Sequence, residues 1–156
     1  MSRKPQPPGD PAESPDREVL PTVEHMNAKN TGIPFNAWLG AKVIDASAAG
    51  VRLHVPWRTE FAGAPGMTHG GILAAIVDLA AYSALKAAGG DGGPTIDMRV
   101  DYHRSTVNGP FYAESKVVRA GSTISTAEVV IRDAEERLIA SGRCVFLTRS
   151  RRLAPG

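Results

Sequence analysis

The middle of the chain holds a histidine, two glycines and an acidic residue whose spacing is suited to chemistry on a carbonyl compound. His69 comes directly before Gly70 and Gly71, and Asp78 follows within an otherwise apolar stretch. A helix that begins at these glycines presents unpaired backbone N–H groups and the positive end of its dipole, which polarise a carbonyl and stabilise an oxyanion. A carboxylate in apolar surroundings is costly unless it is paired or protonated, and such carboxylates are frequent at working sites. The pattern therefore indicates a candidate site in which Asp78 and the helix start are the reactive parts.

The same residues also have a purely structural interpretation. Gly70 and Gly71 can serve a tight entry into a helix, with His69 as a capping or core histidine. Asp78 can hydrogen-bond the hydroxyl of Tyr82, four residues later, inside a packed core. The residue types alone leave both interpretations open.

The stretch 72–85 predicts the helix that carries these groups. Its residues are apolar or small except for Asp78, Tyr82 and Ser83, and the run is too long for a typical strand and too short to span a bilayer. Apolar positions cover most of the circumference, as in a helix enclosed on nearly all sides. Asp78 lies nine residues after His69, which is about 13.5 Å along the axis and about half a turn around it. If both act on one substrate, they come from two copies of the chain related by a twofold axis.

Alternation of apolar and polar residues predicts six strands around this helix. They are expected at 42–47, 51–57, 95–102, 111–119, 123–132 and 137–148, and the short turns between successive strands imply antiparallel neighbours. In the third strand, Thr95 alternates with the apolar residues Ile96 and Met98 and is therefore expected on the opposite, polar face. Because no other apolar segment is available to cover the helix, one sheet must curl around it in an α+β domain.

Composition indicates one domain with polar ends. Residues 1–30 contain six prolines and are expected to form a flexible arm, although a short helix can begin at His25 and Met26. The domain itself is expected at 31–149. The basic segment 150–156 is expected to be a solvated tail, with contact to a substrate phosphate as the alternative.

Charge, cysteine and histidine content argue against several other classes of site and partner. The formal net charge of +2 gives no electrostatic reason to expect nucleic acid. No apolar leader occurs in residues 1–30, so we expect a cytoplasmic protein without stable membrane association. Cys144 stands alone and is expected to be a buried thiol. His25, His54 and His103 lack metal-ligand spacing, so no metal is expected.

The residues around the helix resemble a known family. The string from His69 through Asp78, the glycine-rich break after the helix and the alternating strand through Tyr102 are similar to the hotdog-fold acyl-CoA thioesterases, in particular the phenylacetate-pathway group. The resemblance covers about 36–148. It implies a curved antiparallel sheet around the helix, homodimers that often pair into tetramers, and hydrolysis of an acyl-CoA thioester at the subunit interface. CoA would be part of the substrate, and no metal or organic cofactor would be needed.

The resemblance also implies roles for individual residues. The backbone N–H of Gly71, helped by Gly70, would hold the thioester carbonyl oxygen, and His69 would orient the substrate or the loop. Asp78 of the partner chain would act as general base on water or as nucleophile. Thr95 stands where relatives carry a serine or threonine that helps to place the attacking water.

Other residues are expected to contact the substrate away from the reacting atoms. Arg104 matches a segment that lies along the CoA channel in relatives, and Met67 and Tyr82 belong to the segments expected to line the acyl pocket. Two positions depart from the family pattern, because Gly63 stands where many relatives have asparagine and Ser105 where proline is common. The acyl group itself is set by pocket shape rather than by a motif.

Two other functions stay open on the same fold. A hydratase or dehydratase of acyl thioesters would exchange protons between a histidine and an acidic residue, but the glycine pair after His69 argues against it. A non-catalytic acyl-CoA binding or regulatory module is disfavoured by the presence of Asp78, whereas Gly63 leaves it open.

Overall fold

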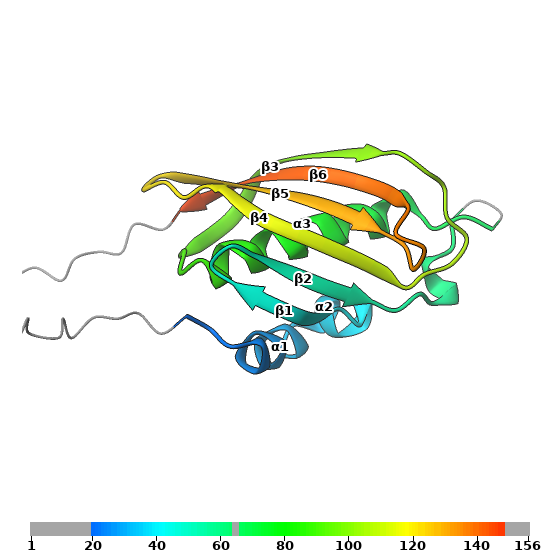
Figure 1. Cartoon of the computed structure of the whole chain (residues 1–156), viewed down its shortest axis with the longest axis horizontal. Coiled ribbons are helices and arrows are strands. Elements are labelled where there is room, and N and C mark those ends of the chain that lie inside the picture. Colours follow the sequence, from blue (N-terminus) through cyan, green and yellow to red (C-terminus); the bar gives the residue numbers. More distant parts are fainter. Residues whose placement is uncertain (1–19, 64–65, 149–156) are drawn as a thin grey trace, which may run out of the picture.

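One curved sheet wraps around one long helix in the computed structural model, which describes residues 20–63 and 66–148. Figure 1 shows the sheet draped over α3, which runs along its concave side. In chain order the elements are α1 (Val23–Thr31), α2 (Pro34–Leu39), β1 (Lys42–Ser47), β2 (Gly50–Val55), the 3-10 helix η1 (Thr59–Phe61), α3 (Gly70–Ala87), β3 (Gly92–Tyr102), β4 (Phe111–Arg119), β5 (Ile124–Arg132) and β6 (Leu138–Thr148). The predicted α+β hotdog architecture is confirmed.

The sheet order leaves β3 at an edge. Within the described residues the six strands lie in the order β1-β2-β4-β5-β6-β3, and every neighbouring pair is antiparallel. Short turns join β4 to β5 and β5 to β6, whereas the chain between β2 and β3 passes through α3 and so carries β3 to the edge opposite β1. All six predicted strands are present, and the largest difference is that β3 begins at Gly92 rather than at residue 95.

The helix α3 supplies the centre of the core. Ile76 and Val77 on the helix are fully buried, as are Phe111 and Ile131 in the strands that cover it. Gly142 of β6 permits a close approach, because a Cβ atom there would lie only 2.5 Å from Val77 Cγ1. Full burial of each large aliphatic side chain contributes about 1.5–3 kcal/mol. By length and composition α3 is long and apolar enough to cross a membrane, but here it is the core helix of the domain.

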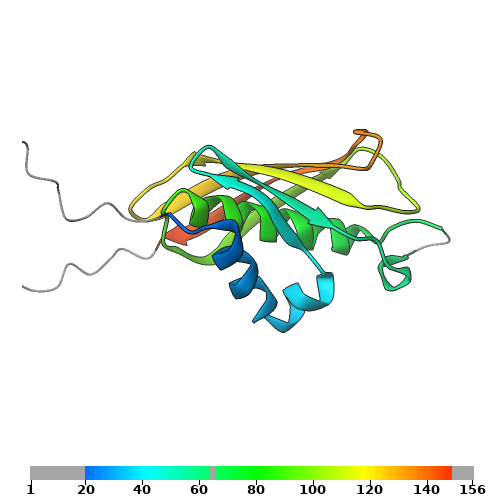
Figure 2. The same cartoon turned by 60° about the horizontal axis from the view of Figure 1, so that its bottom comes forward.

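The segment 23–30 is a helix, so the expected flexible arm over 1–30 is wrong for these residues. Thr22 caps α1 by accepting a hydrogen bond from the His25 backbone N–H at 3.2 Å, and Met26 is buried. The Asn27 side chain donates to the Val43 carbonyl at 2.9 Å and accepts from the Val43 N–H at 2.8 Å, which ties α1 to the free edge of β1. Figure 2 shows α1 and α2 together beside β1. The prolines that indicated a flexible arm all precede the helix.

The ends of the chain lie outside the described residues. These are residues 1–19 of the expected arm, and the predicted basic tail at 150–156.

Candidate active site

The helix α3 begins with a histidine cap. His69 has an extended backbone (φ −63°, ψ 131°), and its Nδ1 accepts a hydrogen bond from the Gly71 N–H at 2.9 Å. This is the usual geometry of an N-cap, in which a side-chain acceptor satisfies one of the unpaired N–H groups of the first turn. The capping interpretation of His69 is therefore confirmed. It also means that the N–H group expected to hold a carbonyl oxygen is already paired in the free chain.

Backbone hydrogen bonds hold the loop that leads to His69. The His69 N–H donates to the Phe61 carbonyl at 2.8 Å, and the Thr68 N–H donates to the Thr106 carbonyl beyond β3 at 2.7 Å. Gly63 packs directly against the histidine, because a Cβ atom there would lie 3.1 Å from His69 Cα and 3.2 Å from its Cδ2. Asparagine, which the resemblance places at this position in many relatives, would require His69 to move by a few tenths of an ångström.

Tyr102, at the end of β3, reaches the start of the helix. Its hydroxyl donates a hydrogen bond to the Gly70 carbonyl oxygen at 3.0 Å. Its ring lies 3.3 Å from the place that a Cβ atom on Gly70 would occupy. Sequence reasoning missed this contact because it treated Tyr102 only as an apolar-face residue. The available signal is the chemistry of tyrosine, whose polar end takes a partner where its ring packs.

These residues surround a groove of about 400 Å³. Four predicted site residues line it, namely Met67, His69, Gly70 and Arg104, and Tyr102 joins them. The groove therefore brings the loop, the helix start and the segment after β3 together within one chain. The other four predicted site residues, Gly71, Asp78, Thr95 and Tyr82, do not line this groove, although Gly71 directly follows Gly70.

Asp78 and Thr95 form a separate pair. The Thr95 hydroxyl donates a hydrogen bond to Asp78 Oδ1 at 2.7 Å. Asp78 is half-buried rather than deeply buried, because α3 is open on this side, next to the edge strand. The carboxylate therefore pairs with Thr95, and the alternative bond to Tyr82 is not among the hydrogen bonds of the described residues.

A bulge in β3 explains how Thr95 reaches the helix. Thr95 pairs with Phe146 of β6, whereas Asp97 pairs with the adjacent Val145, so Ile96 is an extra residue between them. An extra residue shifts the alternation by one and turns the preceding side chain to the other face of the sheet. The expectation that Thr95 lies on the opposite, polar face is wrong, because the alternation of apolar residues does not indicate the bulge at Ile96.

Tyr82 lies one helical turn beyond Asp78, in different surroundings. Its ring packs edge to face against Phe146, with centroids 5.9 Å apart. It lines a second groove, of about 210 Å³, between α1 and α3, together with Lys29 and Lys86. In one chain, therefore, Tyr82 and Met67 belong to different grooves.

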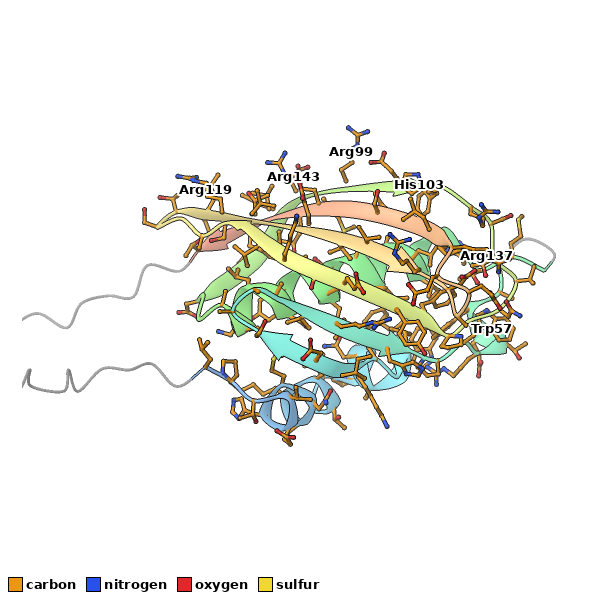
Figure 3. The ribbon with its side chains drawn as sticks, in the orientation of Figure 1. Trp57, Arg99, His103, Arg119, Arg137 and Arg143 are labelled. Carbon is orange, nitrogen blue, oxygen red and sulfur yellow. The ribbon has the colours of Figure 1, made fainter. Side chains whose placement is uncertain are left out.

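The remaining candidate groups do not add to the site. Burial raises the pKa of the Cys144 thiol to about 12, with further contributions from the charges of Asp78 and Asp97, and the side chain is fully buried as predicted. No cluster of metal-ligating side chains occurs in residues 20–63 and 66–148. Figure 3 shows Arg99 and Arg143 pointing away from α3 on the convex side of the sheet, and neither residue lines the groove.

Known proteins share this sequence pattern. Residues 65–140 match the sequence model of the thioesterase superfamily. A protein of Halobacterium salinarum named "Putative esterase" is 37% identical over 123 residues, which cover 70% of this chain and 81% of the relative. A medium/long-chain acyl-CoA thioesterase of Salmonella typhimurium is 28% identical over 137 residues, which cover 74% of this chain and 85% of the relative.

Solved structures share the fold. A protein from the thioesterase superfamily solved by X-ray crystallography has a TM-score of 0.75 and 39% identity, and the match covers 81% of this chain and 98% of that chain. Zebra fish thioesterase superfamily member 2 has a TM-score of 0.73 at 21% identity, over 82% of this chain and 99% of that chain, which supports the fold alone. Since sequence and structure agree over nearly the whole domain, the chain belongs to the thioesterase superfamily.

Proposed function

We propose that the protein hydrolyses acyl-CoA thioesters to a free acid and CoA, at a site shared by two copies of the chain. Membership of the thioesterase superfamily supports thioester hydrolysis in general, and the name of the Salmonella relative supports acyl-CoA as the substrate class. The observation that carries the proposal is that the two reactive parts are present but separate. In one chain, the groove at the helix start excludes Asp78 and its partner Thr95.

The free edge of β3 offers a way to join the two parts. Three apolar side chains of this strand are exposed, namely Ile96 (55%), Met98 (40%) and Tyr102 (55%). Such exposure is unusual beside an unpaired strand edge, because exposed edges pair readily with another chain. A second copy related by a twofold axis covers them and brings Asp78 of one protomer to the helix start of the other. Pairing of such dimers into tetramers stays a further prediction.

The chemistry follows from these groups. Asp78 removes a proton from water as the water oxygen attacks the thioester carbonyl, or attacks the carbonyl itself as nucleophile. The hydrogen bond from Thr95 occupies Oδ1 and leaves Oδ2 for the water. The carbonyl oxygen takes the place of His69 Nδ1 at the Gly71 N–H, where the developing negative charge is stabilised. On the general-base route the C–S bond then breaks, and the CoA sulfur leaves with the proton that Asp78 took from water. On the nucleophilic route the sulfur leaves as a thiolate and the acyl group stays on Asp78 as a mixed anhydride. Water then hydrolyses this anhydride to the free acid, and the proton that Asp78 gives up goes to the thiolate.

The rest of the substrate fits the groove at the helix start. Arg104 lines this groove and offers a cation to the phosphate groups of CoA. Every group used is a protein side chain or amide, and we expect no metal or organic cofactor. Cytoplasmic location without stable membrane association, and the lack of nucleic-acid partners, likewise remain predictions.

A second candidate is acyl-CoA binding without hydrolysis. The observation that favours it is the bond between the Gly71 N–H and His69 Nδ1, because a bound thioester meets an amide that is already paired. The tests below separate binding from turnover.

The first test measures release of free CoA from a panel of acyl-CoAs with a thiol reagent. Replacement Asp78→Ala should lower kcat by about 10²- to 10⁴-fold, the usual contribution of a general base. The matched control is Asp45→Ala, since Asp45 is exposed on β1 at the opposite edge of the sheet. Release at the wild-type rate in Asp78→Ala would rule out Asp78 as the reactive acid, and binding without release would favour the second candidate.

The second test asks whether two chains share the site. Gly71→Pro removes the N–H of the second residue of α3, which has no intrahelical acceptor. The substitution also displaces the His69 side chain, because a Cβ atom at position 71 would lie 2.9 Å from His69 Nδ1. Mixing inactive Asp78→Ala with inactive Gly71→Pro by unfolding and refolding should restore up to about a quarter of the activity, since half of the random dimers are mixed and each has one intact site. No recovery in a mixture that light scattering shows to be dimeric would refute the shared site.

A further inference from the structure

We propose that Tyr102 is a positioning residue that aims the Gly71 N–H at the substrate carbonyl by holding the other end of the same peptide group. The inference rests on the proposed function, because it concerns the amide that the thioester oxygen would meet. It adds a residue that is neither in contact with the reacting atoms nor among the residues that the sequence pattern indicates.

The two ends of one peptide plane are held from opposite sides. The Gly70 carbonyl and the Gly71 N–H belong to a single planar unit, so neither can turn without the other. The carbonyl oxygen accepts from the Tyr102 hydroxyl at 3.0 Å, and the N–H donates to His69 Nδ1 at 2.9 Å. The first contact comes from β3 and the second from the loop before α3.

This arrangement matters because the N–H end must change partner. When the thioester oxygen replaces the imidazole, the contact with His69 is lost at the step where the amide has to be aligned. A peptide between two glycines has more conformational freedom than one between residues with side chains, and first-turn N–H groups have no intrahelical acceptor. The hydroxyl of Tyr102 then persists as the contact from outside the helix, beside the intrahelical bond that a carbonyl in the first turn of α3 accepts.

The same hydrogen bond strengthens the donor. A hydroxyl that donates to a carbonyl polarises the peptide group and makes its N–H a better donor, since linked hydrogen bonds reinforce one another. Packing agrees with this role, because a Cβ atom on Gly70 would lie 3.3 Å from the Tyr102 ring and 3.4 Å from its hydroxyl oxygen. Glycine at position 70 therefore allows the ring and the hydroxyl to approach the peptide plane.

The test is Tyr102→Phe, which keeps the ring against Gly70 and removes only the hydroxyl. The matched control is Tyr112→Phe, since Tyr112 lies on β4 beside His54 and Arg52, and its hydroxyl has no hydrogen bond to another described residue. We expect kcat of Tyr102→Phe to fall about three- to tenfold, as for loss of one neutral hydrogen bond, while KM and thermal stability stay close to wild type. An unchanged kcat, an equal loss in the control, or an effect confined to KM would overturn the proposal.

A second readout does not depend on activity. In ¹⁵N-labelled protein, Tyr102→Phe should move the Gly71 amide resonance upfield in ¹H and speed its hydrogen exchange, whereas Tyr112→Phe should leave both unchanged. If wild-type protein releases no CoA from any substrate but the Gly71 amide still changes in Tyr102→Phe, the proposed activity is wrong and the role of Tyr102 in holding the Gly70–Gly71 peptide group stands. If CoA is released and neither kcat nor the amide changes in Tyr102→Phe, that role of Tyr102 is wrong and the activity stands.

Discussion

Replacing Gly142 by alanine tests how closely the central helix packs on the sheet and whether that packing sets the position of Asp78. The new Cβ atom would lie 2.5 Å from Val77 Cγ1 and 2.9 Å from the Arg99 backbone carbonyl oxygen. Neither neighbour can move easily, because valine in a helix has one strongly preferred rotamer and the carbonyl belongs to the β3 backbone. The helix must therefore shift away from β6.

The expected cost follows from this geometry. Inserting a methyl group into a packed core costs about 1–3 kcal/mol, and for a domain of this size each kcal/mol lowers Tm by about 2–4 °C. We therefore expect Gly142→Ala to lower Tm by about 2–12 °C in calorimetry at fixed protein concentration. Asp78 follows Val77 directly, so the same shift should lengthen the hydrogen bond to Thr95 and lower kcat even at temperatures where the variant is fully folded.

A second substitution makes the reasoning refutable. Val77→Ala alone should destabilise by about 1.6 kcal/mol or more, from two lost methyl groups at about 0.8 kcal/mol each. In the double variant the new methyl of residue 142 occupies the space that Val77 vacates. The double variant should therefore lose at least about 1 kcal/mol less stability than the sum of the losses of the two single variants. Gly32→Ala is the control, because a Cβ atom there has its nearest neighbour at 3.4 Å. Wild-type stability of Gly142→Ala, or additive losses, would show that the close contact is not what limits this position.

Three further predictions concern single groups. Thr95→Val should lower kcat by about tenfold or more, because a hydrogen bond to a charged carboxylate contributes about 1.5–3 kcal/mol, whereas Thr95→Ser should retain most of the activity; equal losses in both would contradict the role of the hydroxyl. Burial raises the pKa of the Cys144 thiol to about 12, so a thiol reagent at pH 8 should react with Cys144 only after unfolding, and fast reaction of the native protein would refute its burial. Burial also raises the pKa of the Asp133 carboxyl, but its hydrogen bonds and ion pair with Arg137 outweigh burial and hold that pKa below its ordinary value. The wild type should therefore have a higher free energy of unfolding than Asp133→Asn, with the full difference present above the unfolded pKa of about 3.9. This difference should disappear as the pH falls through the lower folded pKa; a difference that persists at lower pH would argue against the ion pair.

The fold was predictable because the apolar residues of each main element follow a clear helical or strand periodicity in the sequence. The run 72–85 is apolar around its circumference and can only be an enclosed helix, and the strands after it alternate with short turns between them. With one helix to cover and no other apolar segment, a curled sheet is the remaining solution. The structure bears this out to within three residues at the start of β3, which begins at Gly92 rather than at 95.

The parts that were not predictable depend on contacts between elements distant in sequence. The helix at 23–31 is stabilised by the bonds of Asn27 to Val43, and nothing in the local composition indicates that pairing. The bulge at Ile96 is an irregularity of β3 against β6, so strict alternation placed Thr95 on the wrong face. The hydrogen bond of the Tyr102 hydroxyl was likewise not predictable, because the alternation of apolar residues reflects only the ring.

The strand β3 links the two halves of the proposed site. At its start Thr95 holds Asp78, and at its end Tyr102 holds Gly70. In the proposed dimer, a twofold axis through the middle of the strand exchanges these ends, so that the acid of one copy meets the helix start of the other where the exposed edges pair. In this proposal one strand aligns the carboxylate and the amide, while its edge brings the two chains together. The proposal therefore predicts that dimerisation and catalysis are coupled through β3, and that a substitution that separates the strands abolishes turnover even if each domain stays folded.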